Sequence, residues 1–387
     1  MSPASPARSL SKVEVREVPF DPAGVRRFLA VGARVYRNDP HWVAPLWSDA
    51  TRVLSRANPF FEEATLVLWV ARRDGRDVGR IAGILDRRYQ ARWDRGTAYF
   101  GFFESIDDRE VAGALFGAVA AWARGQGMGR LLGPMNPSAN DECGLLVEGF
   151  DSDPMLMMPY NPGYYPGLVE VAGFRSVKDL QAYRIEVAGM PMERLERVVR
   201  RFRERQPQLE LRAIRKRDLR GELPLIRQVY NQAWDDNWGF VPLSESEIGF
   251  TASRLEPLMT EGLVWVALWA GEPAGILVTV LDYNQALKPL RGRLLSPGLW
   301  RALPYLVGWR RPTTARVILL GVRREFRRKG IETQLLYEGL KVARGLGIES
   351  AEASWILEDN VAVIRTIADQ GGKVAKVYRM YARELAG

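Results

Sequence analysis

Apolar and polar residues follow the same series of periods twice along the chain. Apolar stretches of strand length surround two longer segments in which apolar residues recur every three or four positions, as on one face of a helix. The expected strands cover residues 66–72, a second stretch ending at 86, 98–104, 130–135 and 179–186, and then 263–269, a second stretch ending at 282, 316–322, 350–357 and 377–384. Helices are expected at 110–124 and 331–344. This order predicts an α/β fold with a mixed sheet and helices packed against it.

The two series are also similar in sequence. Four blocks recur in the same order; they are VY at 35 and 229, WVA at 69 and 265, ARG at 123 and 343, and a glycine at 173 and 371. Such self-similarity indicates a repeat architecture. We therefore predict two tandem domains, residues 12–187 and 208–387, called here the first half and the second half. A linker at 188–207 holds a basic helix around 192–205, and residues 1–11 are expected to be a disordered lead.

Changes in the offset between the copies locate two insertions. The offset rises from 196 to 220 between residues 282 and 343, so the second half has 24 extra residues there. It then falls to 198, which places 22 extra residues in the first half between 140 and 173. Extra residues between matched elements are expected to form loops, which often carry function. We call residues 133–166 the first-half loop and residues 287–312 the insertion.

Composition excludes several classes of protein. The 387 residues are 47% hydrophobic and 26% charged, as in ordinary globular proteins. One cysteine, Cys143, and one histidine, His41, can form neither an internal disulfide nor a Cys/His zinc site, so no metal is expected. We also find no signal peptide and no apolar run of about 18 residues that would span a bilayer. These features favour the cytoplasm.

The net charge of +9 is concentrated in one region. Residues 283–324 contain no acid and nine basic residues: Lys288, Arg291, Arg293, Arg301, Arg310, Arg311, Arg316, Arg323 and Arg324. Such a region favours an anionic partner.

Residues 321–336, GVRREFRRKGIETQLL, end a strand, cross a basic turn and open a helix. The amides of a helix N-terminus bind anions, and a glycine allows close approach. This segment resembles motif A of the GNAT acyltransferase superfamily, whose Arg/Gln-x-x-Gly-x-Gly/Ala turn holds the pyrophosphate of acyl-CoA. The resemblance implies that acyl-CoA is the cosubstrate and that it is bound by Leu320, Gly321, Val322, Arg327, Arg328, Lys329, Gly330, Ile331, Thr333 and Asn360. Glu332 and Ile367 depart from the family, which prefers Gly or Ala and often Tyr at these positions.

The first half provides an internal comparison. Where the second half has its basic turn, the first half has Asp107, Asp108 and Glu110, with Glu104 just before them. These carboxylates would repel a pyrophosphate. We therefore expect acyl-CoA to bind the second half only.

The first-half loop contains the candidate catalytic residues. Asp141 and Glu142 are adjacent, and a carboxylate with a raised pKa can deprotonate an ammonium nucleophile. Tyr160 and Tyr165 are candidates for positioning the substrate or protonating the thiolate, and Asn136, Asn140 and Tyr164 are expected to face the substrate. The alternative is a purely structural Asx-turn with aromatic packing. Cys143, which has no convincing His partner, and His41, whose counterpart is Asn237, are interpreted as structural residues.

The insertion, LKPLRGRLLSPGLWRALPYLVGWRRP, interleaves apolar and basic residues without any acid. This composition is typical of a segment that lies on a membrane surface rather than spans it. Trp300, Tyr305 and Trp309 are expected to face lipid, and an anionic membrane is an expected partner, which would make the protein peripheral on the inner membrane. The alternative is a lid over the acyl chain or the other half.

The whole chain resembles the tandem GNAT-like acyl-CoA N-acyltransferases of bacteria, a group that includes the bacterial ceramide synthases. The resemblance implies direct transfer of a long-chain acyl group to an amine, most specifically N-acylation of a sphingoid-type lipid amine, with strand amides near residues 320–322 polarising the thioester. Two alternatives stay open: N-acetylation of a soluble amine or peptide, and a noncatalytic acyl-CoA sensor, which Glu332 and Ile367 favour. A nucleic-acid partner is not expected, because no reader motif accompanies the basic charge.

Overall fold

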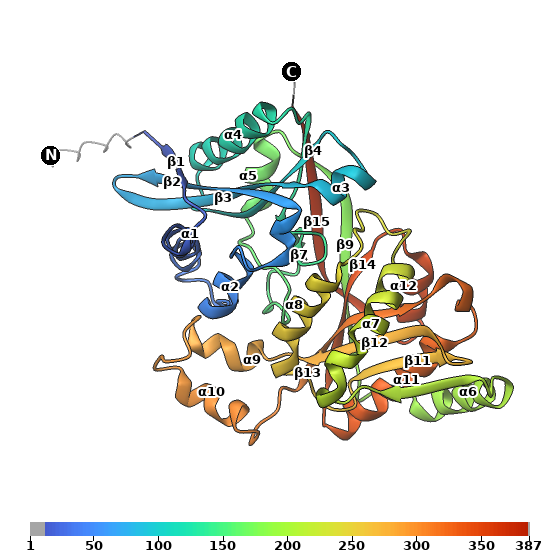
Figure 1. The fold of residues 1–387 in the computed structure, drawn as a ribbon. Helices are drawn as coiled ribbons and strands as arrows, with labels where there is room; N and C mark the ends of the chain where they lie inside the picture. Colours follow the sequence, from blue (N-terminus) through green and yellow to red (C-terminus); the bar gives the residue numbers. More distant parts are fainter. Residues whose placement is uncertain (1–11, 386–387) are drawn as a thin grey trace.

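The computed structural model describes residues 12–385, and most of its strands form one sheet. This sheet has 13 strands in the order β1-β2-β3-β4-β5-β15-β9-β14-β13-β12-β11-β10, with β8 paired to β15, and a separate two-stranded sheet joins β6 to β7. Figure 1 shows the sheet running through both halves, with helices on its faces. The expected mixed α/β fold is confirmed, and every strand and helix expected from the periodicity is present. The lead at 1–11 lies outside the described residues.

In the first half, the elements are β1 (Glu14–Val18), α1 (Pro22–Val35), α2 (Trp47–Val53), β2 (Ala64–Arg73), β3 (Arg76–Asp86), α3 (Arg87–Arg92), β4 (Thr97–Ser105), α4 (Arg109–Gly125), β5 (Arg130–Gly133), β6 (Met135–Asn136), β7 (Glu142–Cys143), β8 (Leu145–Glu148), α5 (Tyr165–Val171) and β9 (Arg175–Glu186). Helix α6 (Met192–Arg205) follows.

In the second half, the elements are β10 (Leu209–Ala213), α7 (Leu219–Ala233), α8 (Glu245–Leu255), β11 (Val264–Trp269), β12 (Glu272–Leu281), α9 (Asn284–Leu287), α10 (Leu299–Leu306), β13 (Thr314–Val322), α11 (Ile331–Gly345), β14 (Ser350–Leu357), α12 (Val361–Ala368) and β15 (Lys373–Glu384). Short 3-10 turns lie at Pro59–Glu62, Lys216–Asp218, Glu256–Leu258, Lys288–Leu290 and Arg324–Phe326.

The last strand of the chain crosses into the first half. β15 pairs antiparallel with β5, where Tyr381 lies opposite Gly133, and with β9 on its other side. β9 in turn pairs with β14 of the second half. Figure 1 shows β15 in red beside the green β9. The two repeats therefore share their final strands rather than forming separate sheets.

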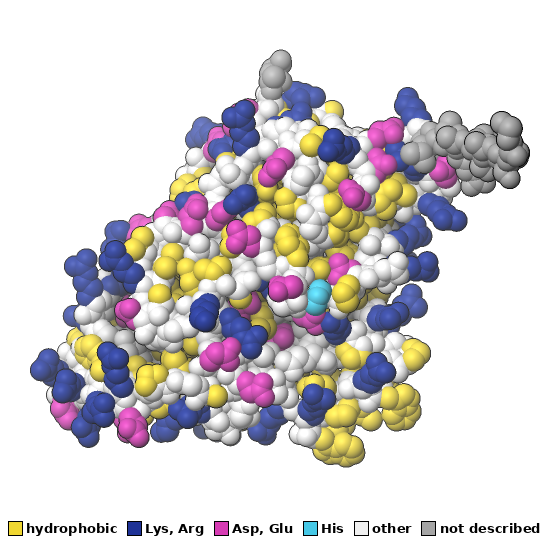
Figure 2. All heavy atoms as spheres, turned by 180° about the vertical axis from the view of Figure 1, so that it is seen from behind, with side chains coloured by type: hydrophobic (Ala, Val, Ile, Leu, Met, Phe, Trp, Pro, Cys, Tyr) yellow, Lys and Arg dark blue, Asp and Glu magenta, His cyan; other side chains and the backbone are white. Residues whose placement is uncertain are grey.

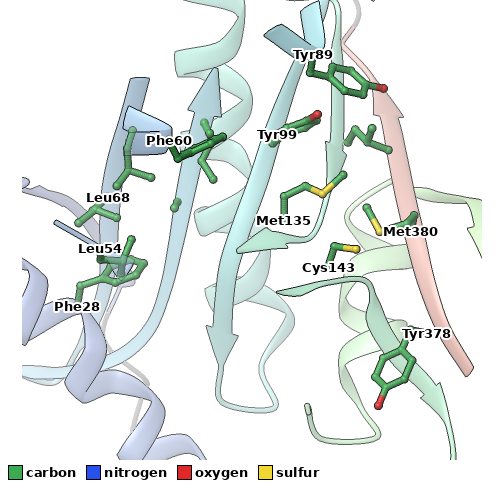
Figure 3. Close-up of a cluster of buried hydrophobic side chains, with 14 of the residues drawn as sticks. Phe28, Leu54, Phe60, Leu68, Tyr89, Tyr99, Met135, Cys143, Tyr378 and Met380 are labelled. Atoms are coloured by element: carbon green, nitrogen blue, oxygen red, sulfur yellow. The ribbon is translucent and has the colours of Figure 1, made fainter. Parts of the chain in front are cut away.

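The core of the first half also takes residues from β15. Figure 3 shows Met135 and Cys143, from β6 and β7, beside Tyr378 and Met380 of β15. All four side chains are buried in one hydrophobic cluster. The β6–β7 hairpin, which includes Glu142, is thus held against the sheet by packing with β15.

Each half contains a pair of parallel strands that separate. β4 pairs with β5 only as far as Tyr99 and Leu132, and β13 pairs with β14 only as far as Val317 and Ala353. Near the same points, the register shifts between β3 and β4 and between β12 and β13. Phe102, at the shift on β4, has φ 50°. In the first half, the residues of β4 beyond this point, Phe102, Phe103 and Glu104, line a cavity. Within residues 12–385, no helix is long and apolar enough to cross a membrane.

Candidate functional site

A cavity of about 430 Å³ lies between the two halves. The first half lines it with the end of α1, the following loop, the end of β4 and the first-half loop, and the second half with the end of α8 and the start of the insertion. Four of the residues expected to act on the substrate line this cavity: Asn136, Asp141, Glu142 and Tyr160. The fold therefore brings these residues together at one cavity.

Asp141 is held by contacts from both halves. The hydroxyl of Ser138 donates to its Oδ2 at 2.7 Å, and Nη1 of Arg254 lies 3.8 Å from its Oδ1. Burial raises the pKa of Asp141 to about 6, although the Ser138 hydrogen bond and the charge of Arg254 oppose the shift. A carboxylate with this pKa is largely ionised at neutral pH and is still basic enough to accept a proton.

Glu142 lies next to Asp141 on β7. Its backbone pairs with Asn136 across the β6–β7 hairpin, which fixes its position in the cavity wall. Burial raises the pKa of Glu142 above its ordinary value, and the neighbouring Asp141 charge raises it further while Arg254 lowers it. The two carboxylates therefore form one coupled acidic pair facing the cavity.

Arg254 and Asp49 were not anticipated from the sequence. Arg254 at the end of α8 donates from Nε and Nη2 to both oxygens of Asp49 on α2, at 2.8 Å each. Both residues line the cavity, so this ion pair joins the halves directly beside Asp141. Neither residue belongs to a recognisable motif, and only the spatial meeting of α2 and α8 brings them to the site.

Tyr160 contributes a hydroxyl that is already engaged. It donates to Asp39 at 3.0 Å, and the Tyr160 carbonyl accepts a hydrogen bond from the Tyr36 hydroxyl at 3.1 Å. Burial and the adjacent Asp39 carboxylate raise the pKa of Tyr160 well above its ordinary value. Tyr160 therefore suits positioning of a substrate better than release of its own proton at neutral pH.

The structure does not bring Tyr164 and Tyr165 to the cavity wall. Tyr165 is fully buried; its hydroxyl donates to Oε2 of Glu104 at 2.6 Å and accepts from the Ser105 amide at 2.8 Å. The Tyr164 hydroxyl donates to the Ser105 carbonyl at 2.8 Å. These contacts hold the end of β4 in place, which is a structural role.

Glu104 also lines the cavity, a position that was not predicted from the sequence. It accepts from Tyr165 and lies 3.3 Å from Nη2 of Arg80. Burial raises the pKa of Glu104, and the Arg80 charge opposes the shift. The sequence placed this residue among acids that would repel phosphate, and only the burial of β4 reveals that it faces the cavity.

The two asparagines of the first-half loop have different positions. Asn136 lines the cavity, and its Oδ1 accepts from the Phe102 amide at 2.6 Å. Asn140 lies outside the cavity lining, where its Nδ2 donates to the Val241 carbonyl at 2.9 Å and its Oδ1 accepts from the Tyr230 hydroxyl at 2.8 Å. Asn140 therefore anchors the loop to the second half.

The residues expected to bind acyl-CoA form a separate loop. Arg328 and Gly330 have φ values of 63° and 71°, and Gly330 precedes α11 without a side-chain cap. The first-turn amides of α11 have no acceptor within the helix, and among them the Glu332 amide is contacted by its own carboxylate. Arg327 stabilises the loop itself, donating to the carbonyls of Val322 at 3.2 Å and Ala233 at 2.7 Å. The loop can thus offer backbone amides and the exposed Arg328 to an anion.

The other members of this set have mixed surroundings. Val322 and Ile331 are buried in the core, so only their backbone can reach a ligand. Leu320 and Gly321 on β13 are partly exposed, where β13 has left β14. Lys329 lies over the ring of Trp269 at 4.6 Å, and Asn360 caps α12 by accepting from Val363. Nothing in the structure involves Thr333 beyond its place in the first turn of α11.

The first half closes the corresponding helix end. The side chain of Asp108 caps α4 by accepting from the amides of Glu110 and Val111. Arg73 forms ion pairs with Asp108 and Glu110. Those amides are therefore already occupied by a carboxylate. This contrast with the uncapped Gly330 supports an anion site in the second half alone.

Cys143 and His41 have structural surroundings. Burial raises the pKa of the Cys143 thiol to about 12, so it is not a thiolate at neutral pH. Nδ1 of His41 lies 2.9 Å from Oδ1 of Asp153, and the other oxygen of Asp153 accepts from Lys288. His41 thus belongs to a contact between the halves.

Comparison with known proteins shows the family of the chain. Residues 224–371 match the acetyltransferase (GNAT) family. Over 370 residues, the chain is 35% identical to the bacterial ceramide synthase of Caulobacter vibrioides, with 94% of this chain and 96% of that protein covered. It is 32% identical to the protein YghO of Escherichia coli over 93% of each chain. The chain belongs to the GNAT family of acyltransferases, whose members use an acyl-CoA cosubstrate.

A solved structure shows that the whole architecture occurs elsewhere. A tandem GNAT protein from the clavulanic acid biosynthesis pathway superposes with a TM-score of 0.59, covering 97% of this chain and 99% of that chain at 14% identity. Such low identity establishes the shared fold only. The tandem GNAT fold expected from the repeat is thereby confirmed.

Proposed function

We propose that this protein transfers a long-chain acyl group from acyl-CoA directly to the amine of a sphingoid-type lipid. The observation that carries the proposal is the pair Asp141 and Glu142, which are half-buried and line a cavity between the halves, with the pKa of Asp141 raised to about 6. The similarity over nearly the full chain to a protein called bacterial ceramide synthase supports the choice of acceptor.

The acyl-CoA would bind along β13, with its pyrophosphate at the start of α11. The side chain of Arg316 on β13 donates to the carbonyls of Leu156 and Met157 at 2.8 Å each, and both of these residues line the carboxylate cavity. β13 therefore lies directly behind the cavity wall.

In the reaction, the Asp141–Glu142 pair takes the proton of the ammonium group, and the free amine attacks the thioester carbonyl. The tetrahedral intermediate then collapses: the C–S bond breaks, the attacking nitrogen gives up its second proton to leave a neutral amide, and the CoA thiolate takes up a proton and leaves as the thiol. Asn136 and Tyr160 would orient the acceptor, and strand amides of β13 would polarise the carbonyl. The ionised form of the pair acts as the general base.

The insertion would hold the protein on an anionic membrane. It carries the three most exposed large hydrophobic side chains among the described residues: Leu295, Trp300 and Trp309 are 91%, 79% and 85% exposed. Figure 2 shows apolar and basic side chains together at the corner of the molecule that α10 forms. This combination fits the interface between lipid headgroups and acyl chains.

Thiol release from acetyl-, octanoyl- and palmitoyl-CoA, with and without sphinganine, tests the proposal when the products are identified by mass spectrometry. Sphinganine-dependent release of CoA from palmitoyl-CoA with formation of the amide is the expected result. Preference for acetyl-CoA and a soluble amine would overturn the lipid assignment.

The second candidate is a noncatalytic acyl-CoA sensor. Ile367 is an aliphatic side chain buried in a small cluster with Tyr183 and Ile356, so it has no proton to give to the leaving thiolate. Acyl-CoA binding without transfer to any supplied amine would favour this function.

A further inference from the structure

A second cavity, of about 800 Å³, adjoins the carboxylate cavity. Its walls come from the end of α1 and the loop after it, and from the insertion. The two cavities share five wall residues: Ala33, Tyr36, Trp42, Ala44 and Arg291. The two cavities therefore adjoin along these residues, and we call them together the passage, with the insertion at its outer end and Asp141 and Glu142 at its inner end. Each volume lies within the range of about 300–1,000 Å³ that is common for ligand sites.

The insertion forms one wall of this passage because it is fastened to the first half. The Trp47 amide donates to the Gly292 carbonyl at 3.0 Å, and Lys288 forms an ion pair with Asp153 at 2.5 Å. The inner residues Leu290 and Ala302 are fully buried. The same segment carries the exposed apolar side chains on its outer surface, so the passage begins where the protein would meet a membrane.

Charge changes sign along the passage. At the outer end, Lys288 is paired with Asp153, and Arg37, Arg291 and Arg301 remain beside one lining acid, Asp39, which is already hydrogen-bonded by Tyr160. At the inner end, Arg254 is paired with Asp49 and Arg80 with Glu104. This leaves the carboxylates of Asp141 and Glu142 in excess there. Lipid phosphates fit the outer end, and an ammonium group fits the inner end.

Apolar side chains line the section between these ends. Trp42, Val43, Leu46 and Trp47 contribute from the first half, and Leu255 and Leu287 from the second. An alkyl chain can lie against these side chains, whereas a peptide or a sugar would leave its polar groups without partners there. The passage therefore has the surface that a single-chain lipid amine requires.

We infer that a long-chain amine enters from the bilayer through this passage with its ammonium group first. The ammonium group moves to Asp141 and Glu142, while the alkyl chain stays between Trp42 of the first half and Leu287 of the second half. This inference rests on the N-acyltransferase function proposed above, and it adds the direction of entry and the part of the protein that selects the acceptor.

Ala33→Trp tests the passage. Ala33 is exposed near the end of α1 and lies in the wall shared by the two cavities, so an indole there obstructs the passage without overpacking the core. Ala23→Trp is the matched control, because Ala23 is exposed on the same helix and lines neither cavity. Circular dichroism and thermal unfolding establish that both variants fold as the wild type does.

The first measurement is photolabelling by a long-chain amine that carries a diazirine on its alkyl chain, presented in phosphatidylcholine vesicles with phosphatidylglycerol. We expect labels in residues 36–47 and 255–291 of the wild type and of Ala23→Trp, and about tenfold less labelling there in Ala33→Trp. Equal labelling of the two variants, or labelling confined to other residues, would overturn the passage.

The second measurement is kcat/KM for palmitoyl transfer to the same amine in vesicles, with acyl-CoA binding measured in parallel. Ala33→Trp should lower kcat/KM about tenfold and leave acyl-CoA binding unchanged. Amide formation at the wild-type rate in Ala33→Trp would overturn the passage and retain the enzyme function. Labelling of the passage without amide formation from any acyl-CoA would instead overturn the enzyme function and retain the passage.

Discussion

Asp141 and Arg254 come from opposite halves of the chain, and Oδ1 of the carboxylate lies 3.8 Å from Nη1 of the guanidinium. The positive charge of Arg254 lowers the pKa of Asp141, whereas the negative charge of Asp49, bound to the same arginine, raises it. Burial is the main cause of the raised pKa, the Ser138 hydrogen bond opposes it, and these charges together with that of Glu247 adjust it to about 6. The strength of the candidate base therefore depends on contact between the halves.

Arg254→Met and Asp49→Asn should shift the pH dependence of turnover in opposite directions. An ionised Asp141 is needed to take the proton, so kcat/KM is expected to fall as the pH drops through about 6. Loss of Arg254 should move this fall to higher pH by about one unit, and loss of the Asp49 charge should move it lower. Profiles of kcat/KM against pH for the three proteins measure this, and shifts in the same direction would contradict the assignment.

Asp141→Asn should stabilise the protein above pH 6. The pKa of about 6 in the folded protein exceeds the ordinary value of 3.8, so the ionised carboxylate destabilises the folded state, fully above about pH 6 and not at all below pH 3.8. The free energy of unfolding of the variant relative to wild type should therefore rise by about 2–3 kcal/mol between these limits. Urea unfolding at pH 4.5 and 7.5 checks this; a difference that is the same at both pH values would contradict it.

Arg328→Glu should weaken acyl-CoA binding about tenfold or more, because it replaces an exposed cation beside the uncapped start of α11 with an anion. Arg109→Glu makes the same change at the start of α4, where Asp108 already caps the helix. Calorimetric titration with palmitoyl-CoA should show a dissociation constant within about twofold of the wild type for this control. Equal losses in both variants would place the CoA site elsewhere.

Trp300→Ala combined with Trp309→Ala should lower affinity for anionic vesicles about tenfold or more, since two indoles that are 79% and 85% exposed can no longer enter the lipid. Val171→Ala, at an apolar residue that is 59% exposed on α5, should leave vesicle binding unchanged. Sedimentation with vesicles measures both. Undiminished binding by the double variant would exclude the insertion as the membrane contact.

Local pattern predicted the elements well because each strand and helix is encoded within a short window. The spacing of apolar residues placed the strand at 350–357 and the helix from 331 at the bounds that the structure has. The repeat offsets likewise directed attention to the first-half loop and the insertion, and both segments line the cavities.

Long-range pairing could not be predicted in the same way. β9 and β15 carry similar sequences, so nothing local decides which half each one joins, and only the assembled sheet places β15 next to β5. Glu104 and Arg254 were missed for a related reason: neither belongs to a motif, and each reaches the cavity through packing between segments far apart in the chain.

The exchange of final strands has a consequence for synthesis of the protein. β15 is translated after both β5 and β9, which precede the linker helix, yet it fills a place between them. Until residues 373–384 leave the ribosome, β5 has an open edge that can pair with other chains. A gene divided at the linker would separate the first half from β15, which pairs with β5, and the second half from β9, which pairs with β14. The covalent link therefore keeps both of these strand pairings within one chain.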